Sequence, residues 1–510
     1  MPHTVGMENK PTRAWTLWLI LVALLAWAPG AQAACSGSGL AWSCPAGSNS
    51  SDIQTTLNNA SDGATLTFAA GTYSWTSWAQ FSNAKGATLI CASPGACVVN
   101  FSGTVLGISS FSGNNTHLYR ISGFAFQNNP SSSFVIWFDG NGVMSRIRVD
   151  HNSFSNLAEA TVCVFFGDTQ GIANYYGVIE HNTMSTGTSS MLMHYIGALN
   201  PNPPPTPMGT ANNMFVEDNT VTIANLTNAG ESCSDSWGGA AVVWRHNTTL
   251  NCLVAAHGAL HAGGPQNWEY YNNVQSLNAN SVSQGMADGY RQFHHQGSGE
   301  FIAFNNTFQA YSGRSTDVIA MMYYRDEASL AASEGGTVCD GTQSIDGNRL
   351  PTTTYHGYPC WHQPGRDFAN NLQPLYVWNN KWSDTGAKID LTMEDYGGYH
   401  ANHFMADRDY YNAVGSVQTS PNSPFSGATG MGFGPLANRP ASCTTNALES
   451  GGGVGYFATD VGSQGTLYRC SAPNTWTVHY TPYTYPHPLT LGGVVADATP
   501  PARPQGFTLR

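Results

Sequence analysis

The residues of this sequence that could carry chemistry gather at the ends of short apolar segments. Six such segments follow one another: VCVFF at 162–166, MLMHY at 191–195, SCSDSW at 232–237, LVAAHG at 253–258, YRQFHH at 290–295 and AMMYYR at 320–325. Histidine, tyrosine and arginine at these positions suit proton transfer and the binding of a carboxylate. The candidates for catalysis are His257, His295, Tyr324 and Arg325, and those for substrate binding are Arg291, His194, Asp235, His261 and His294.

These side chains favour the eliminative cleavage of a polymer that contains uronic acid. Such a lyase must neutralise the C6 carboxylate, remove the proton from C5 and protonate the leaving glycosidic oxygen. Arg291 or Arg325 would bind the carboxylate through two parallel hydrogen bonds. His257 or His295 would act as the base, and Tyr324 would act as the acid. The predicted function is therefore that of a polysaccharide lyase.

Other chemistries find less support in the sequence. It contains no H-E-x-x-H, P-loop, G-x-S-x-G or C-x-x-C motif, so zincin, nucleotide-dependent and α/β-hydrolase mechanisms are disfavoured. A glycoside hydrolase needs two carboxylates across its groove, and Asp235 has no evident partner in the sequence. A hydrolase or an epimerase is kept as an alternative. So is a non-catalytic carbohydrate-binding or adhesin-like protein, whose aromatic side chains would stack on sugar rings.

Cofactors are not assigned from the sequence. Calcium prefers several oxygen ligands, and this stretch holds no dense cluster of carboxylates. Calcium is therefore left open, without ligands.

A repeated pattern must position these residues. An apolar segment closed by Asn, with a polar and then an apolar residue after it, recurs with most spacings between 24 and 37 residues. The repeated asparagines are Asn128, Asn152, Asn182, Asn219, Asn247, Asn272, Asn306 and Asn380. Between them lie short alternating runs of Val, Ile, Phe, Tyr and Trp, which indicate strands rather than helices. The pattern predicts stacked coils of three short strands, with each Asn in a left-handed turn and bonded to its neighbours in adjacent coils.

The start of the chain adds a cap to this pattern. Residues 52–73 combine Ile53, Leu57 and Ala60 at helical spacing with a strand, TLTF, and a Gly-Thr-Tyr turn. This cap and the asparagine-marked coils, over about residues 50–412, resemble secreted right-handed parallel β-helix proteins of the pectate-lyase-like superfamily. The resemblance implies an all-β fold, a three-sheet solenoid with an N-terminal helical cap. It also implies that the six polar-ended segments are the first strands of their coils, and that the substrate groove runs over the first sheet.

One feature of that superfamily does not carry over. Some of its lyases use a lysine base, but the lysines after the leader are Lys85, Lys381 and Lys388, all outside the polar-ended segments.

Residues 1–33 have the features of a secretory signal peptide. Lys10 and Arg13 precede an apolar run from Trp15 to Trp27, and residues 31–33 read Ala-Gln-Ala, a cleavage site. The predicted location is secreted or periplasmic. No other apolar run reaches membrane length, so no membrane association is expected after cleavage.

Cysteine content and charge agree with export. Ten cysteines lie in neighbouring pairs, predicted to be disulfides: Cys35 with Cys44, Cys91 with Cys97, Cys233 with Cys252, Cys339 with Cys360, and Cys443 with Cys470. Cys163 is left over and is expected to be a buried apolar residue. The formal charge of −12 disfavours nucleic acid as a partner. A polysaccharide, acidic if cations gather locally, is the expected partner of a monomer.

The sequence divides into a leader, a long repetitive part and a tail. Residues 34–415 are expected to form the β-helix, interrupted at about 326–374 by a disulfide-tied loop insertion. Residues 416–510 are expected to be an irregular C-terminal tail, with a hairpin held by Cys443 and Cys470, that packs on the coils.

Overall fold

The computed structural model describes most of the chain after the leader. The described residues are 34–115, 117–130, 134–167, 173–188, 190–197, 208–224, 233–256, 265–277, 293–296, 299–309, 319–322, 364–367, 371–394, 404–414, 425–446 and 450–491. The predicted signal peptide and most of the predicted insertion lie outside these ranges. Within them, no helix combines the length and the apolar character that crossing a bilayer requires.

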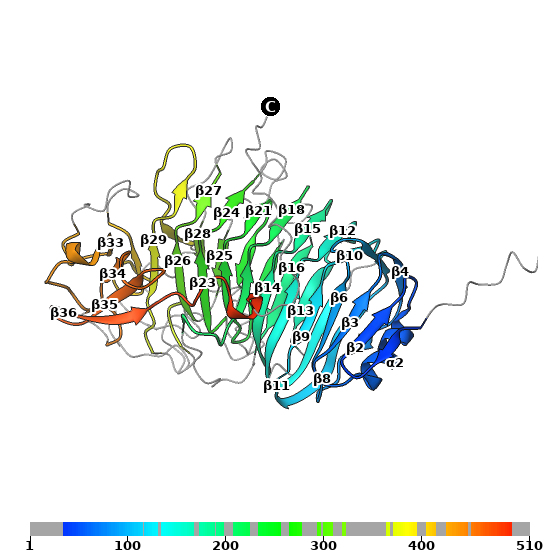
Figure 1. Ribbon diagram of the computed structural model, residues 1–510. Helices are drawn as coiled ribbons and strands as arrows, with labels where there is room; N and C mark the ends of the chain where they lie inside the picture. Colours follow the sequence, from blue (N-terminus) through cyan, green and yellow to red (C-terminus); the bar gives the residue numbers. More distant parts are fainter. Residues whose placement is uncertain are drawn as a thin grey trace, which may run out of the picture.

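The described chain is all-β, and most of its strands lie side by side along one stack (Figure 1). Their pairings divide them into three rows, here called the first, second and third sheets. The first sheet contains β5 (Ala79–Gln80), β8 (Leu106–Asn114), the N-terminal half of β11 (Phe134–Asp150), β13 (Val162–Phe166), β16 (Met191–Ile196), β19 (Ser234–Trp237), β22 (Val254–Ala256), β25 (Phe293–Gln296), β28 (Ile319–Met322) and β31 (Leu391–Glu394). The second sheet contains β2 (Ala41–Cys44), β3 (Ala64–Phe68), β6 (Ala87–Cys91), β9 (Tyr119–Ser122), the C-terminal half of β11, β14 (Ala173–Glu180), β17 (Met214–Glu217), β20 (Ala241–Arg245), β23 (Asn267–Tyr271), β26 (Glu300–Phe304), β29 (Leu375–Trp378) and β32 (Tyr410–Asn412).

The third sheet contains β4 (Gly71–Trp75), β7 (Cys97–Phe101), β10 (Phe124–Gln127), β12 (Ser153–Ser155), β15 (Thr183–Thr186), β18 (Thr220–Ile223), β21 (Thr248–Leu250), β24 (Val274–Ser276), β27 (Thr307–Phe308) and β30 (Lys381–Trp382). The first and second sheets are continuous with each other because the long strand β11 belongs to both.

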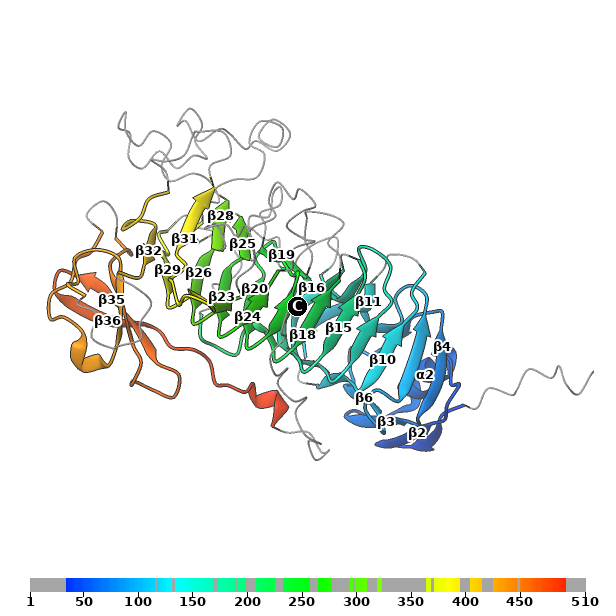
Figure 2. The ribbon, with the colours of Figure 1, turned by 90° about the horizontal axis from the view of Figure 1, so that it is seen from above.

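Strand pairing follows a regular rule along the chain. Each strand from β13 to β29 pairs in parallel with the strand three places later, as β13 does with β16, β14 with β17, and β29 with β32. Seen from above, the strands succeed one another along a single stack (Figure 2). The prediction of an all-β chain built on parallel sheets is confirmed.

The interior of the stack is filled by apolar and aromatic side chains. Trp75, Trp244 and Trp268 are fully buried, together with the inward-facing residues of all three sheets. Equivalent side chains in adjacent strands meet face to face, as Phe126 and Phe154 do with ring centroids 5.3 Å apart. Parallel strands in register bring such pairs together at about the inter-strand spacing of 4.8 Å. The short alternating apolar runs of the sequence therefore form strands whose inward-facing side chains build the core.

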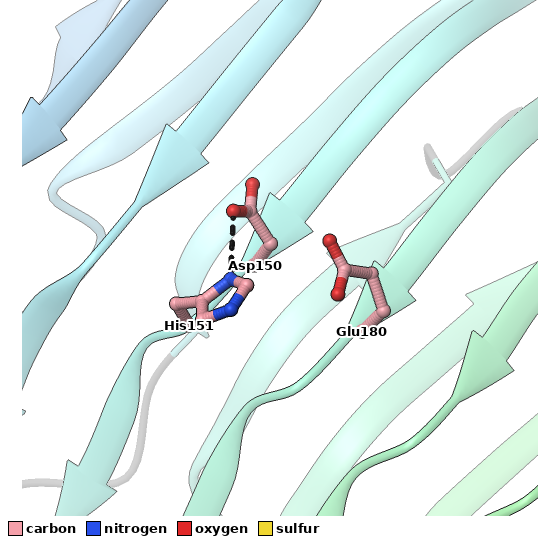
Figure 3. A group of neighbouring side chains, drawn as sticks. All are labelled: Asp150, His151 and Glu180. Carbon is pink, nitrogen blue, oxygen red and sulfur yellow. Dashed lines mark hydrogen bonds and ion pairs between the residues drawn. The ribbon is translucent and has the colours of Figure 1, made fainter. Parts of the chain in front are cut away.

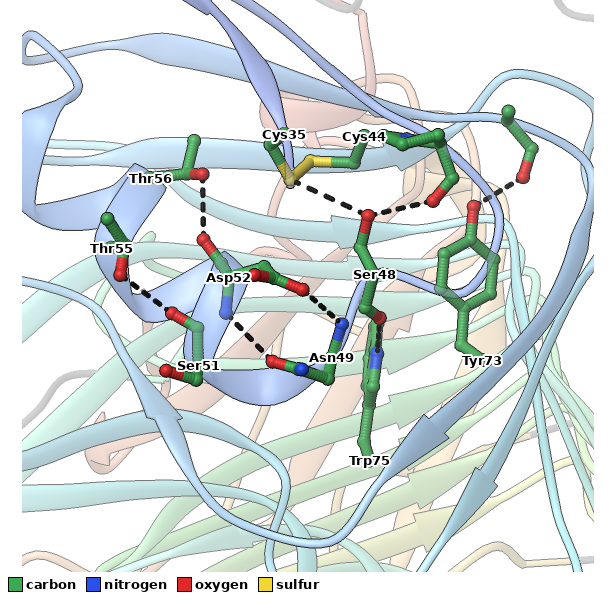
Figure 4. The surroundings of a disulfide bond; sticks show 12 residues. Cys35, Cys44, Ser48, Asn49, Ser51, Asp52, Thr55, Thr56, Tyr73 and Trp75 are labelled. Carbon is green, nitrogen blue, oxygen red and sulfur yellow. Dashed lines mark hydrogen bonds between the residues drawn. A yellow bond between two sulfur atoms is a disulfide. The ribbon is translucent and has the colours of Figure 1, made fainter. Parts of the chain in front are cut away.

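A short helix covers the N-terminal end of this core. In α2 (Ser50–Asn59), Asn49 accepts a hydrogen bond from the Asp52 amide at 3.0 Å, and the Asp52 carboxylate accepts one from the Asn49 amide at 2.9 Å. This capping box fixes the start of the helix. Ile53 and Leu57 then point into the core. The disulfide between Cys35 and Cys44 lies beside the helix (Figure 4).

Buried asparagines form a ladder at the turn between the second and third sheets. Asn247 is representative: its Oδ1 accepts from the backbone N and from Nδ2 of Asn219, both at 3.0 Å, and its Nδ2 donates to the carbonyl of Val216 at 2.8 Å. The same pattern links Asn152, Asn182, Asn219, Asn247, Asn273, Asn306 and Asn380. The predicted stacking of asparagines is observed.

Three details of the predicted ladder are wrong. The left-handed residue is the one before the ladder asparagine, as at His151, His181 and His246, where φ lies between 51 and 57°. In the doubled Asn272-Asn273 pair, the ladder member is Asn273, and Asn272 occupies the left-handed position. Asn128 closes β10 in the third sheet, and at that level the backbone N of Phe124 donates to Asn152 instead.

The chain after residue 424 forms a small sheet and a strap. The sheet contains β33 (Met431–Gly434), β34 (Gly455–Ala458), β35 (Thr466–Ala472) and β36 (Thr475–Tyr480), with β35 and β36 in an antiparallel hairpin. Two short 3-10 helices, η3 (Leu436–Asn438) and η4 (Pro488–Thr490), complete this part. At the N-terminal end of the described chain, β1 (Ser36–Ser38) pairs with β2. Residues 480–490, here the C-terminal strap, run back along the outer face of the second sheet (Figure 1).

Four of the five predicted disulfides lie in the described residues and are formed. They join Cys35 to Cys44, Cys91 to Cys97, Cys233 to Cys252, and Cys443 to Cys470. Cys443 lies in the loop before β34, so its bridge ties that loop to β35 rather than closing the hairpin itself. The pair Cys339 and Cys360 falls outside the described residues. Cys163 is buried with its thiol unbridged, as expected.

Candidate functional site on the first sheet

The described parts of the six polar-ended segments lie in adjacent strands of the first sheet. They belong to β13, β16, β19, β22, β25 and β28, which pair in parallel in that order. The predicted order of these segments along one sheet is confirmed. Because side chains alternate between the two sides of a strand, one row of residues faces the core and the next faces outward.

The outward row brings together two of the predicted substrate-binding residues. Phe165 of β13 pairs in register with His194 of β16, and His194 pairs with Asp235 of β19. The side chain of His194 is 18% exposed, whereas that of Asp235 is 1% exposed. Nε2 of His194 lies 3.5 Å from Oδ2 of Asp235, close enough for an ion pair when the imidazole is protonated. The sequence placed both residues along one sheet face but did not predict this contact.

A tryptophan completes this polar group. Trp237 lies two residues after Asp235 and pairs in register with Ile196. Its indole Nε1 donates a hydrogen bond to Nε2 of His194 at 3.2 Å. His194, Asp235 and Trp237 form one contact group, which sequence reasoning found only in part. The missed signal was the S-D-S-W alternation, which puts Trp237 on the same side of β19 as Asp235.

Aromatic side chains continue this face toward the N-terminal end. The Phe165 ring meets His194 edge to face at 5.2 Å, and it stacks on Phe134 with centroids 4.0 Å apart. Trp137 packs against Phe165 and stacks on Trp78, whose ring plane differs by 6°. In register, Gly107 of β8 lies opposite both Gln80 and Trp137. A Cβ at Gly107 would lie 1.9 Å from the carbonyl oxygen of Trp137, so the two strands approach too closely there for a larger residue.

The remaining predicted site residues are described only in part or not at all. His257, His261, Arg291, Tyr324 and Arg325 lie outside the described residues. For His294 and His295 the backbone of β25 is described, and it pairs them with Ala255 and Ala256 of β22. Ser234 pairs with Val254, so Ala255 continues the register row of Asp235 and His194, and Ala256 continues that of Ser236 and Tyr195. By register, His294 belongs to the row of His194, and His295 belongs to the neighbouring row.

A second concentration of charge lies on the outer face of the second sheet. Arg245 donates from Nε to Glu217 at 2.7 Å and from Nη1 to the Tyr271 hydroxyl at 2.9 Å. Its two Nη atoms also donate to the carbonyls of Tyr483 and Thr484 in the C-terminal strap, at 2.7 and 2.9 Å. These contacts give Arg245 a structural role, because they join the second sheet to the strap. The strap covers this side of the stack.

The sequence carries a regular signal for this network. A charged residue stands two positions before successive ladder asparagines, as Asp150, Glu180, Glu217 and Arg245 do. Parallel register therefore stacks three acids and one arginine in adjacent strands.

Buried carboxylates in this network could suggest a metal site. Ligand atoms of Asp150, His151 and Glu180 lie within 4.8 Å of one another (Figure 3). However, Arg120 donates to Asp150 from Nε and Nη2 at 2.7 and 2.6 Å, and Nη2 of Arg148 donates to Glu180 at 2.7 Å. Two guanidinium groups already balance the two carboxylates, and a divalent cation would meet their repulsion. The donor set does not fit calcium or another resident metal.

The pKa of Asp150 agrees with this interpretation. Burial alone would raise the pKa of this carboxyl group. Hydrogen bonds from Arg120 and His151, with the charge of Arg148, outweigh burial and hold the pKa well below its usual range. Asp150 is therefore an ionised, fully paired structural group.

Two solved structures are similar to this chain at low sequence identity. No protein-family model and no curated protein matches the sequence. Among solved structures, the chain is similar to an alginate lyase from Paenibacillus sp. str. FPU-7, with 14% identity and a TM-score of 0.34 over 55% of this chain and 97% of that chain. It is also similar to a mutant of the PL6 family alginate lyase AlyGC, with 13% identity and a TM-score of 0.34 over 75% of this chain and 52% of that chain. At such identity, function has to be argued from the side chains of the site itself.

Proposed function

We propose that this chain is an exported right-handed parallel β-helix enzyme, a lyase that cleaves a uronic-acid-containing polysaccharide by β-elimination. The reaction would take place over the outer face of the first sheet. One arrangement carries the proposal: His194 and Asp235 lie side by side on that face, and the register of β22 and β25 continues their row to His294. In this proposal residues 1–33 are the signal peptide, 34–415 the β-helix and 416–510 the tail.

The proposed reaction divides into three tasks. Arg325, with Arg291, binds the C6 carboxylate through charge-assisted hydrogen bonds, which makes the proton on C5 more acidic. A histidine base removes that proton, and the electron pair of the C5–H bond forms the C4–C5 double bond. The C4–O bond breaks, and Tyr324 gives its proton to the leaving oxygen.

Three histidines are candidates for the base that removes the C5 proton. His257 and His295 are the predicted bases. By register His295 belongs to the row of Tyr195, which is buried in the core, so His294, in the row of His194 and Asp235, replaces it as a candidate on the outer face. Single substitutions of the three histidines by alanine separate them. The base is the residue whose loss abolishes turnover while substrate binding persists.

The test uses the purified mature protein and a panel of uronic-acid polymers. A lyase produces unsaturated sugar ends, which are followed by their ultraviolet absorbance. Tyr324→Phe should lower turnover at least about a hundredfold, the contribution typical of general acid catalysis, and should leave binding nearly unchanged. The neighbouring Tyr323→Phe is the matched control and should retain activity. New reducing ends without unsaturation would indicate a hydrolase, and a changed uronate without chain cleavage would indicate an epimerase.

A non-catalytic carbohydrate-binding protein is the second candidate. It is favoured by the partly exposed Trp78, Trp137 and Phe134 on the same face. Aromatic rings of this kind offer an apolar surface to a sugar ring. Such a protein would bind polysaccharide without releasing product, and its affinity would tolerate His257→Ala together with His295→Ala.

A further inference from the structure

The outer face of the first sheet carries a hydrophobic cluster of its own, separate from the core inside the stack. Phe165 of β13 is a buried member, and Phe134 and Trp137 of β11 pack against it and are partly exposed. Trp78, which precedes β5, adds a second partly exposed indole that stacks on Trp137 with centroids 5.2 Å apart. Trp78, Phe134, Trp137 and Phe165 are here called the aromatic patch. Exposed apolar surfaces of this kind mark interaction sites.

The rings of the aromatic patch hold one another in fixed orientations. Phe134 stacks on Phe165 at 4.0 Å, and both phenyl rings meet the Trp137 indole steeply, with interplanar angles of 69 and 79°. Nε1 of Trp137 donates to the carbonyl of Gly167 at 3.0 Å, which fixes the indole further. A ligand therefore meets a preformed surface, and little conformational entropy of these side chains is lost on binding.

Small polar side chains adjoin the aromatic patch. The Ser109 hydroxyl donates to Oε1 of Gln80 at 2.6 Å, and both side chains are partly exposed. Gln80 follows Trp78 by two positions, and Ser109 follows Gly107, which pairs in register with Trp137. An aromatic surface beside an amide and a hydroxyl suits a sugar ring, because the ring has apolar C–H groups and polar hydroxyl groups.

The aromatic patch shares a register row with the proposed catalytic region but lies far from it. The row runs from Trp137 through Phe165 to His194. It continues through Asp235 to the backbone position of His294 on β25. At about 4.8 Å for each neighbouring strand, β11 and β25 lie about 24 Å apart. A ligand that reaches both ends of this row must be a chain of sugars and not a single ring.

We propose that the aromatic patch is a distal subsite, which binds a sugar ring of the polysaccharide several units away from the bond that is cleaved. The inference rests on the proposed function, because it takes the outer face of the first sheet as the substrate face. The four patch residues carry no charge, so they recognise the apolar C–H face of the ring and not its carboxylate. The subsite makes affinity depend on chain length, since a short oligosaccharide held at the catalytic residues does not reach the patch.

The kinetic test compares long and short substrates. Trp78→Ala and Trp137→Leu each remove one flat ring and leave the proposed catalytic residues in place. KM for the intact polymer should rise about fivefold with kcat little changed, the size expected when one aromatic contact is lost. For the shortest oligosaccharide that is cleaved, both constants should stay the same. Trp42→Leu is the matched control, because Trp42 of β2 is also partly exposed and donates from Nε1 to a backbone carbonyl.

A binding test does not depend on turnover. Electrophoresis of the wild type and of both patch variants through gels that contain the polymer measures affinity, which should fall about fivefold in the variants. Urea unfolding confirms that the variants are folded. If Trp137→Leu does not fold, Trp78→Ala alone decides, because Trp78 lies outside the buried part of the cluster.

The outcomes separate the distal subsite from the elimination. Unchanged KM and affinity for the polymer, or equal losses for polymer and short oligosaccharide, would overturn the subsite and leave the elimination in place. Weaker binding by the patch variants, with no unsaturated product from the wild type, would uphold the patch as a sugar site and overturn the elimination. A wild-type dimer that the patch substitutions dissociate, seen by sedimentation, would assign the patch to a second copy of this chain and overturn the subsite.

Discussion

The docking of the C-terminal strap should depend on pH through Glu269. This carboxyl group is fully buried on β23, where it accepts hydrogen bonds from the Tyr480 hydroxyl at 2.5 Å and from the Gly209 amide at 2.7 Å. Burial raises its pKa from 4.5 to about 7, although both hydrogen bonds and the charge of Arg245 act in the opposite direction. The folded protein therefore holds this proton more tightly than the unfolded chain does.

The sign and size of the effect follow from linkage. Stability from a carboxyl group with a raised pKa is fully present below 4.5 and is lost as the pH rises through about 7. The separation of the two pKa values corresponds to a loss of about 3 kcal/mol in the free energy of unfolding. His487 works in the opposite sense. Burial and the charges of Arg245 and Arg148 lower its pKa from 6.5 to about 3, so its contribution is present above 6.5 and lost on acidification.

The perturbation that isolates Glu269 is Glu269→Gln. Urea unfolding of wild type and variant across this pH range gives the difference between their free energies of unfolding, in which His487 and other groups cancel. Relative to the variant, the wild type should lose about 3 kcal/mol as the pH rises from 4.5 to 7. Glu159→Gln, at an exposed carboxylate, is the control for the amide substitution itself. A difference between wild type and Glu269→Gln that does not change with pH would refute the reasoning.

Three further predictions concern the ladder, the strap and the cysteines. Asn247→Ala removes the acceptor of the buried Asn219 amide and should lower the free energy of unfolding by about 1 to 3 kcal/mol. Asn212→Ala, at an exposed asparagine, is the control and should leave it unchanged. Equal urea midpoints for wild type and Asn247→Ala would contradict the stabilising role of the ladder. Arg245→Met leaves Glu217 buried without its cation, so the free energy of unfolding should fall by about 3 to 5 kcal/mol. Because Arg245 also binds the strap, proteolytic cleavage within the strap should become faster. An unchanged cleavage rate would contradict the role of Arg245 in holding the strap. Titration of denatured, unreduced mature protein should find one thiol, that of Cys163, whereas two or more would break the predicted pairing.

Much of the fold was predictable because parallel stacking leaves a strong trace in sequence. Asn182 and Asn219 repeat because each must supply an acceptor to the coil before it and donors to nearby carbonyls. The sequence analysis chose Asn272 instead of Asn273 as the ladder residue. Two asparagines stand together there, so residue type alone does not show which one is left-handed and which one is buried in the ladder. Counting from the strand end resolves it, since Tyr271 aligns with Arg245 and the ladder residue comes two places later.

The candidate site was predictable only where strand alternation sufficed. His194 and Asp235 were found because register sets their contact. For Trp237, the S-D-S-W alternation indicates only that it shares a side of β19 with Asp235, and its diagonal contact with His194 on β16 depends on the fold. The C-terminal contacts were beyond a local pattern, since Arg245 and Tyr483 are joined across 238 positions of sequence. Long-range contacts of this kind depend on how the tail folds back over the stack.

The central claim is that the outer face of the first sheet carries an eliminative site. Initial rates of unsaturated product formation from uronic-acid polymers, measured for the wild type and for His257→Ala, His294→Ala and His295→Ala, test it most directly. We predict that the wild type produces unsaturated ends and that loss of one of these histidines abolishes their formation while the polymer still binds. A wild type that binds or cleaves the polymer without forming unsaturated ends, or three histidine variants with undiminished rates, would contradict the account.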